Sequence, residues 1–167
     1  MGASWPVRNL ARVIAVHLWS LRLPGELAET TEEKPFQQWI GRTVRQWLDD
    51  SYPSRFAVRI EAGEGGVEPI RAFQTSFWPD VSVESTDGDR LVAIEVKCLR
   101  GSGLPARLTQ ALGQALMCKQ IYAQGLVALV PLRQLELPPP PFFENVSEHG
   151  IEVAIVGGVT SLGVSHT

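Results

Sequence analysis

Two carboxylates are spaced so that they could hold a divalent cation between them, with a lysine nearby. Asp80 belongs to one run of alternating apolar and polar residues, and Glu95 and Lys97 belong to the next. Between the runs, Asp87-Gly88 favours the type I′ turn of a β-hairpin, which requires positive φ at both central residues. Counting outward from this two-residue loop predicts that Asp80 faces Glu95.

Two opposed carboxylates are unfavourable in a sheet, because facing Cβ atoms lie only about 5 Å apart. A divalent cation between them would turn the repulsion into binding, and Mg²⁺ accepts carboxylate oxygens in this way. Side-chain alternation puts Glu95 and Lys97 on one face and Val96 in the core. Two other interpretations stay open: the register is slipped by two residues, or both acids are solvated on an open sheet face.

Two helices are expected before the hairpin. Apolar spacing predicts the first over residues 7–22, either as an ordinary core-covering helix or as an added helix that mediates a dimer. The second runs to Asp50, with Thr30 or Thr31 as its N-cap and Pro35 in an early helical position.

The remaining elements follow from alternation, continuous apolar runs and Gly or Pro punctuation. They are a strand over 56–61, a loop over 63–66, either a short strand or an extended lead into the hairpin over 70–74, a helix over 106–124, a buried strand over 126–132, a polyproline connector over 138–141, a strand over 151–156 and a Gly-, Ser- and Thr-rich tail over 157–167. A helix crossing between two strands implies that these strands are parallel. We therefore expect an α/β fold with a mixed β-sheet flanked by helices.

Composition restricts the class of protein. A chain of 167 residues with 44% hydrophobic residues suits one globular domain. The net charge of −3 provides no global basic field to attract nucleic acid. Cys98 and Cys118 show no metal-ligand spacing and are expected to be buried thiols in a reducing compartment. No apolar run is long enough for a membrane span. His17 and Arg22 interrupt the first apolar segment and no small-residue cleavage site follows it, which argues against a signal peptide, so we expect a cytoplasmic protein.

The hairpin residues carry a family resemblance. Pro79-Asp80, fourteen intervening residues and then Glu95-Val96-Lys97 resemble the active-site signature of the PD-(D/E)XK nuclease superfamily, which has the restriction-endonuclease-like fold. The resemblance covers about residues 30–132, with the family order αβββαβ. The helix over 7–22 and an extension over 133–167 would complete a single nuclease-like domain.

The resemblance assigns roles to these residues. Asp80 and Glu95 would bind Mg²⁺, with Mn²⁺ able to substitute, and the Val96 carbonyl would complete the metal shell. Lys97 would orient or deprotonate the attacking water, or stabilise charge on the phosphorane. A cation that polarises a phosphate and lowers the pKa of a bound water suits such hydrolysis.

Two further family positions have candidates in this chain. Many members carry a Glu in the first core helix; Glu33 is the candidate here, with Glu32 and Glu29 as alternatives and a simple acidic first turn as the other interpretation. The branch related to RecB carries Gln, three residues and then Tyr in the second helix. Gln114 stands in the Gln place, but Cys118 occupies the Tyr position, so Gln110 and Tyr122 remain alternatives.

We therefore expect a Mg²⁺-dependent endonuclease that hydrolyses DNA, in defence or repair. An enzyme that acts on RNA instead is a weaker alternative. Its phosphate contacts would be Arg100, Arg107 and Lys119. Because one such site cuts one strand, double-strand cleavage would need a homodimer or a partner subunit. The alternative is a non-catalytic nuclease-fold subunit that binds nucleic acid or assembles into a larger complex.

Overall fold

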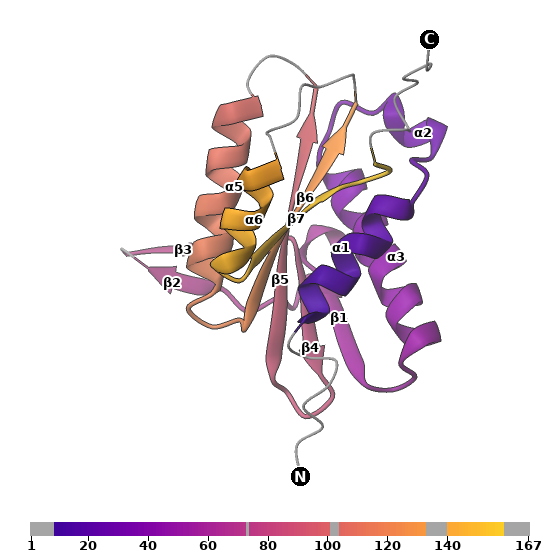
Figure 1. The fold of residues 1–167 in the computed structure, drawn as a ribbon. Coiled ribbons are helices and arrows are strands. Elements are labelled where there is room, and N and C mark those ends of the chain that lie inside the picture. The colour runs from indigo at the N-terminus through magenta and orange to yellow at the C-terminus, as the bar shows by residue number, and fades with distance from the viewer. Residues whose placement is uncertain (1–8, 73, 101–103, 133–139, 159–167) are drawn as a thin grey trace.

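A mixed sheet organises the protein (Figure 1). The computed structural model describes residues 9–72, 74–100, 104–132 and 140–158, and within them the sheet has five strands in the order β1-β4-β5-β6-β7. The strands are β1 (Phe56–Ile60), β4 (Val81–Ser85), β5 (Arg90–Leu99), β6 (Gln124–Pro131) and β7 (Ile151–Ile155), with β2 (Ile70–Ala72) and β3 (Thr75–Phe77) in a separate two-stranded sheet. The helices are α1 (Leu10–Ser20), α2 (Gly25–Ala28), α3 (Lys34–Ser51), α4 (Glu61–Glu64), α5 (Leu104–Cys118) and α6 (Pro140–Glu148).

The strand directions confirm the expected mixed α/β sheet. β1, β4 and β5 are antiparallel neighbours, and β5, β6 and β7 are parallel neighbours. α5 crosses from β5 to β6, and α6 precedes β7, as parallel connections require. Among the described residues, no helix is both long enough and apolar enough to cross a membrane.

The β4–β5 hairpin has the predicted register but not the predicted turn. The loop holds three residues, because the Ser85 N–H donates to the Asp89 carbonyl at 2.8 Å. Gly88 has a φ of 92°, whereas Asp87 is not in the left-handed region, so the type I′ turn was wrong. An irregularity beside Val83 then shifts the pairing by one residue, and Val83 faces Val92. The longer loop and the bulge offset each other.

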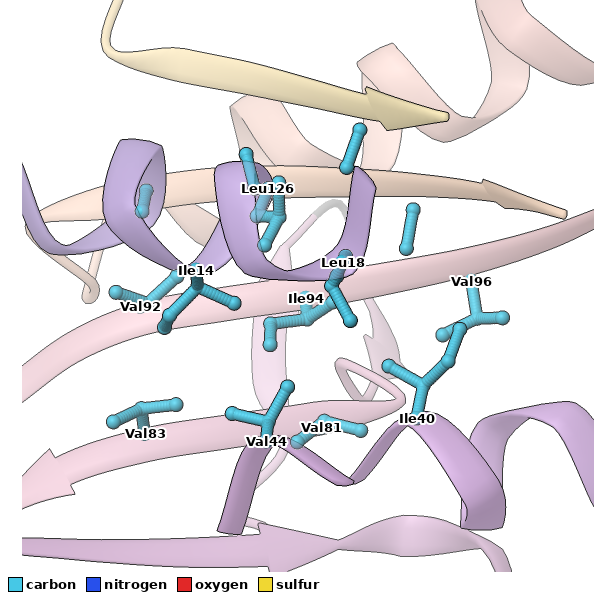
Figure 2. Packing of buried hydrophobic residues seen from close by; sticks show 14 of the residues in the cluster. Ile14, Leu18, Ile40, Val44, Val81, Val83, Val92, Ile94, Val96 and Leu126 are labelled. Atoms are coloured by element: carbon cyan, nitrogen blue, oxygen red, sulfur yellow. The ribbon is translucent and has the colours of Figure 1, made fainter. Parts of the chain in front are cut away.

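Apolar side chains cover the sheet on both faces. α1 and α3 pack on one face, and α5 and α6 pack on the other (Figure 1). Figure 2 shows Ile14 and Leu18 of α1 and Ile40 and Val44 of α3 packed against the sheet, where Ile94 projects from β5. All five are fully buried, and burying each contributes about 2 kcal/mol relative to exposure. α1 is therefore a core-covering helix over its described residues.

α3 begins differently from the prediction. Glu33 is its N-cap residue and makes no side-chain capping bond, so capping by Thr30 or Thr31 was wrong; Pro35 does lie in the first turn. Gly41 lets the helix approach β1 closely. A Cβ atom at this position would lie 2.5 Å from Cγ1 of Ile60, a separation that would force one of the two to move.

Several element boundaries also differ. α5 ends at Cys118 rather than 124, and residues 119–123 form turns that lead into β6. The predicted loop over 63–66 begins inside the irregular helical turn α4. The predicted polyproline connector was wrong where it is described, because Pro140 and Pro141 begin α6; proline is well tolerated in a first helical turn. Residues 138 and 139, and the tail from 159 onward, lie outside the described residues.

Candidate active site

The candidate site lies where β5 extends beyond β4. The antiparallel pairing runs only as far as Val81 opposite Ile94, whereas β5 continues to Leu99. The following residues of β5 pair with β6 on one side, which leaves their other edge without a strand neighbour from β4. Asp80 and the start of α3 approach β5 from this side, as their contacts with Val96 and Lys97 show. Continuing the register by one residue places Asp80 beside Glu95, as predicted.

The Asp80 carboxylate takes the place of the missing strand. Its Oδ2 accepts a hydrogen bond from the Val96 N–H at 2.7 Å, and its Oδ1 accepts one from Nε2 of Gln37 at 2.7 Å. The Asp80 backbone is held as well, because its carbonyl accepts the Glu61 N–H at 3.0 Å. Both oxygens of the side chain are therefore oriented by donors.

Glu95 is almost completely enclosed, with 1% of its surface exposed. The Cys118 thiol donates to its Oε1, with a sulfur–oxygen distance of 3.7 Å. Burial raises the Cys118 pKa above its usual range, so the group is a thiol that can donate. This contact brings the end of α5 to the same face of β5 as Glu95.

Both carboxyl groups hold their protons more tightly than usual. Burial, followed by the nearby Asp80 carboxylate, raises the Glu95 pKa to about 8. Burial raises the Asp80 pKa to about 6, against the opposing effects of the Val96 N–H and of Lys97. Besides burial, the Asp80 carboxylate raises the Glu95 pKa, and the Glu33 carboxylate raises that of Asp80, so added positive charge is favourable at this site.

Lys97 is buried on the same face, with 8% of its surface exposed. Its Nζ lies 3.2 Å from Oε1 of Glu33, and Oε2 of Glu33 lies 3.5 Å from Nη1 of Arg107. Glu33 therefore joins the strand lysine to an arginine of α5. Among the alternatives raised from sequence, Glu33 is the acid seen in contact with Lys97.

The other basic candidates divide between two places. Arg107 donates to the Cys98 carbonyl at 3.2 Å, at the carboxyl end of β5. Arg100 follows that strand; its guanidinium lies 6.0 Å from the centre of the Phe36 ring, and its Nη2 is buried with no hydrogen-bond partner among the described residues. Lys119 donates instead to the His149 carbonyl, near the beginning of the parallel strands. Arg100 and Arg107 thus border the site, and Lys119 does not.

Gln114 lies one helical turn before Cys118, so both side chains project from the same side of α5. It is half-buried, and its Oε1 has no hydrogen-bond partner among the described residues. The structure therefore places Gln114 on the side of α5 that reaches Glu95, without a direct contact to that carboxylate.

Asp80 and Glu95 are the residues best placed to hold a metal ion. Within the part of the chain that the structure describes, no group of three or more His, Cys, Asp or Glu side chains could do so. Mg²⁺ is often bound by only one or two protein carboxylates, with water and phosphate oxygens as the other ligands. The pair of Asp80 and Glu95 offers two such carboxylates.

Gln37 is the site residue that the sequence interpretation missed. It lies four residues after Glu33, and residues four apart share one face of a helix. That spacing was a usable signal once Glu33 had been assigned to the site. What it could not reveal was that Asp80 is within reach.

Comparisons with known proteins add no relative to this description. No family model, no curated protein and no solved structure matches the chain. The chemistry of the site therefore follows from its own residues and geometry.

Proposed function

We propose that this protein is a Mg²⁺-dependent endonuclease of the PD-(D/E)XK type that hydrolyses DNA phosphodiester bonds. The observation that carries the proposal is the pair formed by buried Glu95 and partly buried Asp80 beside Lys97. Two adjacent acids with raised pKa values are costly to keep charged, and a divalent cation relieves that cost.

The order of elements supports a restriction-endonuclease-like core. α3, β1, β4, β5, α5 and β6 follow one another as helix, three sheet strands, helix and strand, which is the order that the family resemblance implies. The small β2–β3 sheet is an insertion between the first two of those strands. α1 and the α6–β7 unit are additions at the two ends of this core.

Each residue of the site has a distinct proposed role in the hydrolysis. Asp80 and Glu95 would hold the cation, which supplies a Lewis acid for the phosphate and a bound water of lowered pKa. Lys97 places a positive charge beside them, where it can stabilise negative charge that develops on the phosphate. Glu33 holds the Lys97 ammonium in position.

Local charge favours a nucleic-acid substrate despite the overall charge of −3. Burial raises the pKa of the Cys98 thiol, and Arg100, Arg107 and Lys97 all lie close enough to that thiol to oppose the rise. Arginine suits bidentate contacts with phosphate. These residues form the proposed phosphate-binding edge, and Lys119 lies outside it.

A plasmid-cleavage assay tests the proposal. Supercoiled plasmid and single-stranded DNA are incubated with the protein in Mg²⁺, in Mn²⁺ and in chelator, together with Asp80→Ala and Lys97→Ala. Matched controls are Asp87→Ala, in the exposed hairpin loop, and Lys119→Ala. We expect metal-dependent cleavage that both site variants lose and both controls keep. Undiminished cleavage by Asp80→Ala would overturn the assignment.

A specific contact favours a second candidate, a non-catalytic subunit that binds nucleic acid or assembles into a larger complex. Glu33 forms ion pairs with both Lys97 and Arg107, and its negative charge neutralises part of the positive charge at the site. This candidate predicts that the protein binds labelled DNA in fluorescence anisotropy but cleaves no DNA with either metal.

A further inference from the structure

α3 sends side chains to the candidate site from two successive turns. Glu33 contacts Lys97 at 3.2 Å, and Gln37 contacts Asp80 at 2.7 Å. A single rigid helix thus touches both the ammonium group and one of the two carboxylates. The distance between the Lys97 ammonium and the Asp80 carboxylate therefore depends on where α3 packs on the sheet.

α3 packs closely against the sheet next to the site. Ile40 and Val44 are fully buried against the sheet, and Gly41 lets the backbone approach Ile60 more closely than any larger residue would. Gln37 lies one turn before this close contact. Its position relative to β4 is therefore determined by packing.

The two Asp80 oxygens depend on different kinds of donor. Oδ2 is bonded by the Val96 backbone, which every residue type at that position except proline would supply. Oδ1 is bonded by the Gln37 side chain. A carboxylate oxygen has two lone pairs, so Oδ1 can accept this amide and still coordinate a cation. Gln37 is compatible with an ion on the same carboxylate.

We infer that Gln37 is a positioning residue, which orients the Asp80 carboxylate for the metal ion. The inference rests on the proposed function. Ligating carboxylates are commonly held by outer hydrogen bonds, and loss of such a partner typically lowers metal affinity by about 10- to 100-fold. Gln37 acts through Asp80 and needs no contact with the substrate.

The neighbouring Gln38 provides a matched control. It is half-buried on the same helix, as Gln37 is, but its Nε2 donates to the Ala62 carbonyl at 2.9 Å. Methionine is similar to glutamine in length and lacks the amide donor. Gln37→Met therefore removes the hydrogen bond to Asp80 inside the site. Gln38→Met removes two hydrogen bonds outside the site, the one to the Ala62 carbonyl and the one that its Oε1 accepts from Arg42.

The experiment measures Mn²⁺ affinity of the full chain by titration calorimetry and, separately, plasmid cleavage across Mn²⁺ concentrations. We expect Gln37→Met to weaken Mn²⁺ binding by about tenfold. The metal concentration for half-maximal cleavage should rise by the same factor, and saturating Mn²⁺ should restore the rate to within about threefold. Gln38→Met should match the wild type in both measurements. If Gln37→Met only destabilised the fold, the cleavage rate would fall at every Mn²⁺ concentration, saturating Mn²⁺ included.

The outcomes separate the two proposals. Equal Mn²⁺ affinity in the wild type and Gln37→Met would overturn the role of Gln37 and leave the nuclease proposal standing. Weaker binding by Gln37→Met, with no cleavage by any form, would support the positioning role and count against the nuclease. If the wild type binds no Mn²⁺, both are overturned.

Discussion

The two faces of β5 contrast within a single strand. Ile94 and Val96 are fully buried in the apolar cluster under α1 and α3, whereas Glu95 and Lys97 are buried on the other face. The first pair stabilises the fold by removing apolar surface from water. The second pair lowers stability, because charged groups lose hydration when they are buried. One strand thus supports the core with alternate residues and places reactive groups with the others.

The largest expected effect concerns the charged face. Glu95→Gln removes a proposed metal ligand while keeping nearly the same shape. We expect DNA cleavage to fall by roughly 10³-fold or more, which corresponds to about 4 kcal/mol of transition-state stabilisation. The measurement is the rate of plasmid nicking at saturating Mg²⁺. Glu84→Gln, an acid on β4 that pairs with Arg59, is the control and should retain its rate.

Truncation on the apolar face should affect stability instead. Ile94→Ala leaves a cavity among fully buried side chains, and we expect the free energy of unfolding to fall by about 3 kcal/mol. Urea denaturation followed by circular dichroism measures this change. Val16→Ala, at a side chain that is 65% exposed, should cost less than about 0.5 kcal/mol. If Ile94→Ala lowered cleavage per folded molecule as strongly as Glu95→Gln does, the two faces would not be independent.

The pH dependence of stability should reveal the cost of the buried acid. The folded-state pKa of Glu95 is raised to about 8, so the folded protein binds this proton more tightly than the unfolded chain does. Its contribution to stability is present at low pH and is lost as the pH rises through about 8. At pH about 9 we expect Glu95→Gln to be more stable than the wild type by roughly 3–5 kcal/mol, and at pH about 4 nearly equal.

Urea unfolding of both proteins across this pH range provides the check. Mg²⁺ should recover stability of the wild type at the alkaline end and have little effect on Glu95→Gln, because only the wild type offers the carboxylate. Wild-type stability that increases with pH relative to the variant would contradict the raised pKa.

The smallest expected effect on stability comes from substituting the two cysteines, one of which lies on each side of β5. Cys98 lies in the apolar cluster, whereas Cys118 donates to Glu95. Cys98→Ser would bury a hydroxyl in apolar surroundings and should cost about 1–2 kcal/mol in unfolding free energy. Cys118→Ser keeps a donor beside the carboxylate and should cost less than about 1 kcal/mol. Thermal unfolding measures both; equal losses would show that the two surroundings do not differ in polarity.

Much of the site could be predicted from local pattern. Alternation along β5 separates Glu95 and Lys97 from the core residues, because successive side chains of a strand point to opposite faces. The hairpin register also followed from a local signal, although the turn type did not. A three-residue loop and a bulge compensate each other, and no property of Asp87-Gly88 alone reveals that compensation.

Longer-range features could not be predicted in this way. Pro140 and Pro141 read as a stiff connector but begin α6, because a proline in a first helical turn loses no hydrogen bond. Lys119 was expected on the helix over 106–124 that flanks the site, yet α5 ends at Cys118 and Lys119 lies near the start of β7. Its distance from Lys97 depends on strand order, which a one-dimensional pattern does not specify.

The amino-acid sequence by itself determined the faces of the strands, the hairpin that brings Asp80 beside Glu95, and the candidacy of Glu33. These depend on residues that are near in the chain or related by a simple period. Only the tertiary structure decided that Gln37 bonds Asp80, that Cys118 bonds Glu95 and that Arg107 shares Glu33 with Lys97. Such contacts join separate elements, and they exist because packing of α3 and α5 on the sheet brings their side chains within bonding distance.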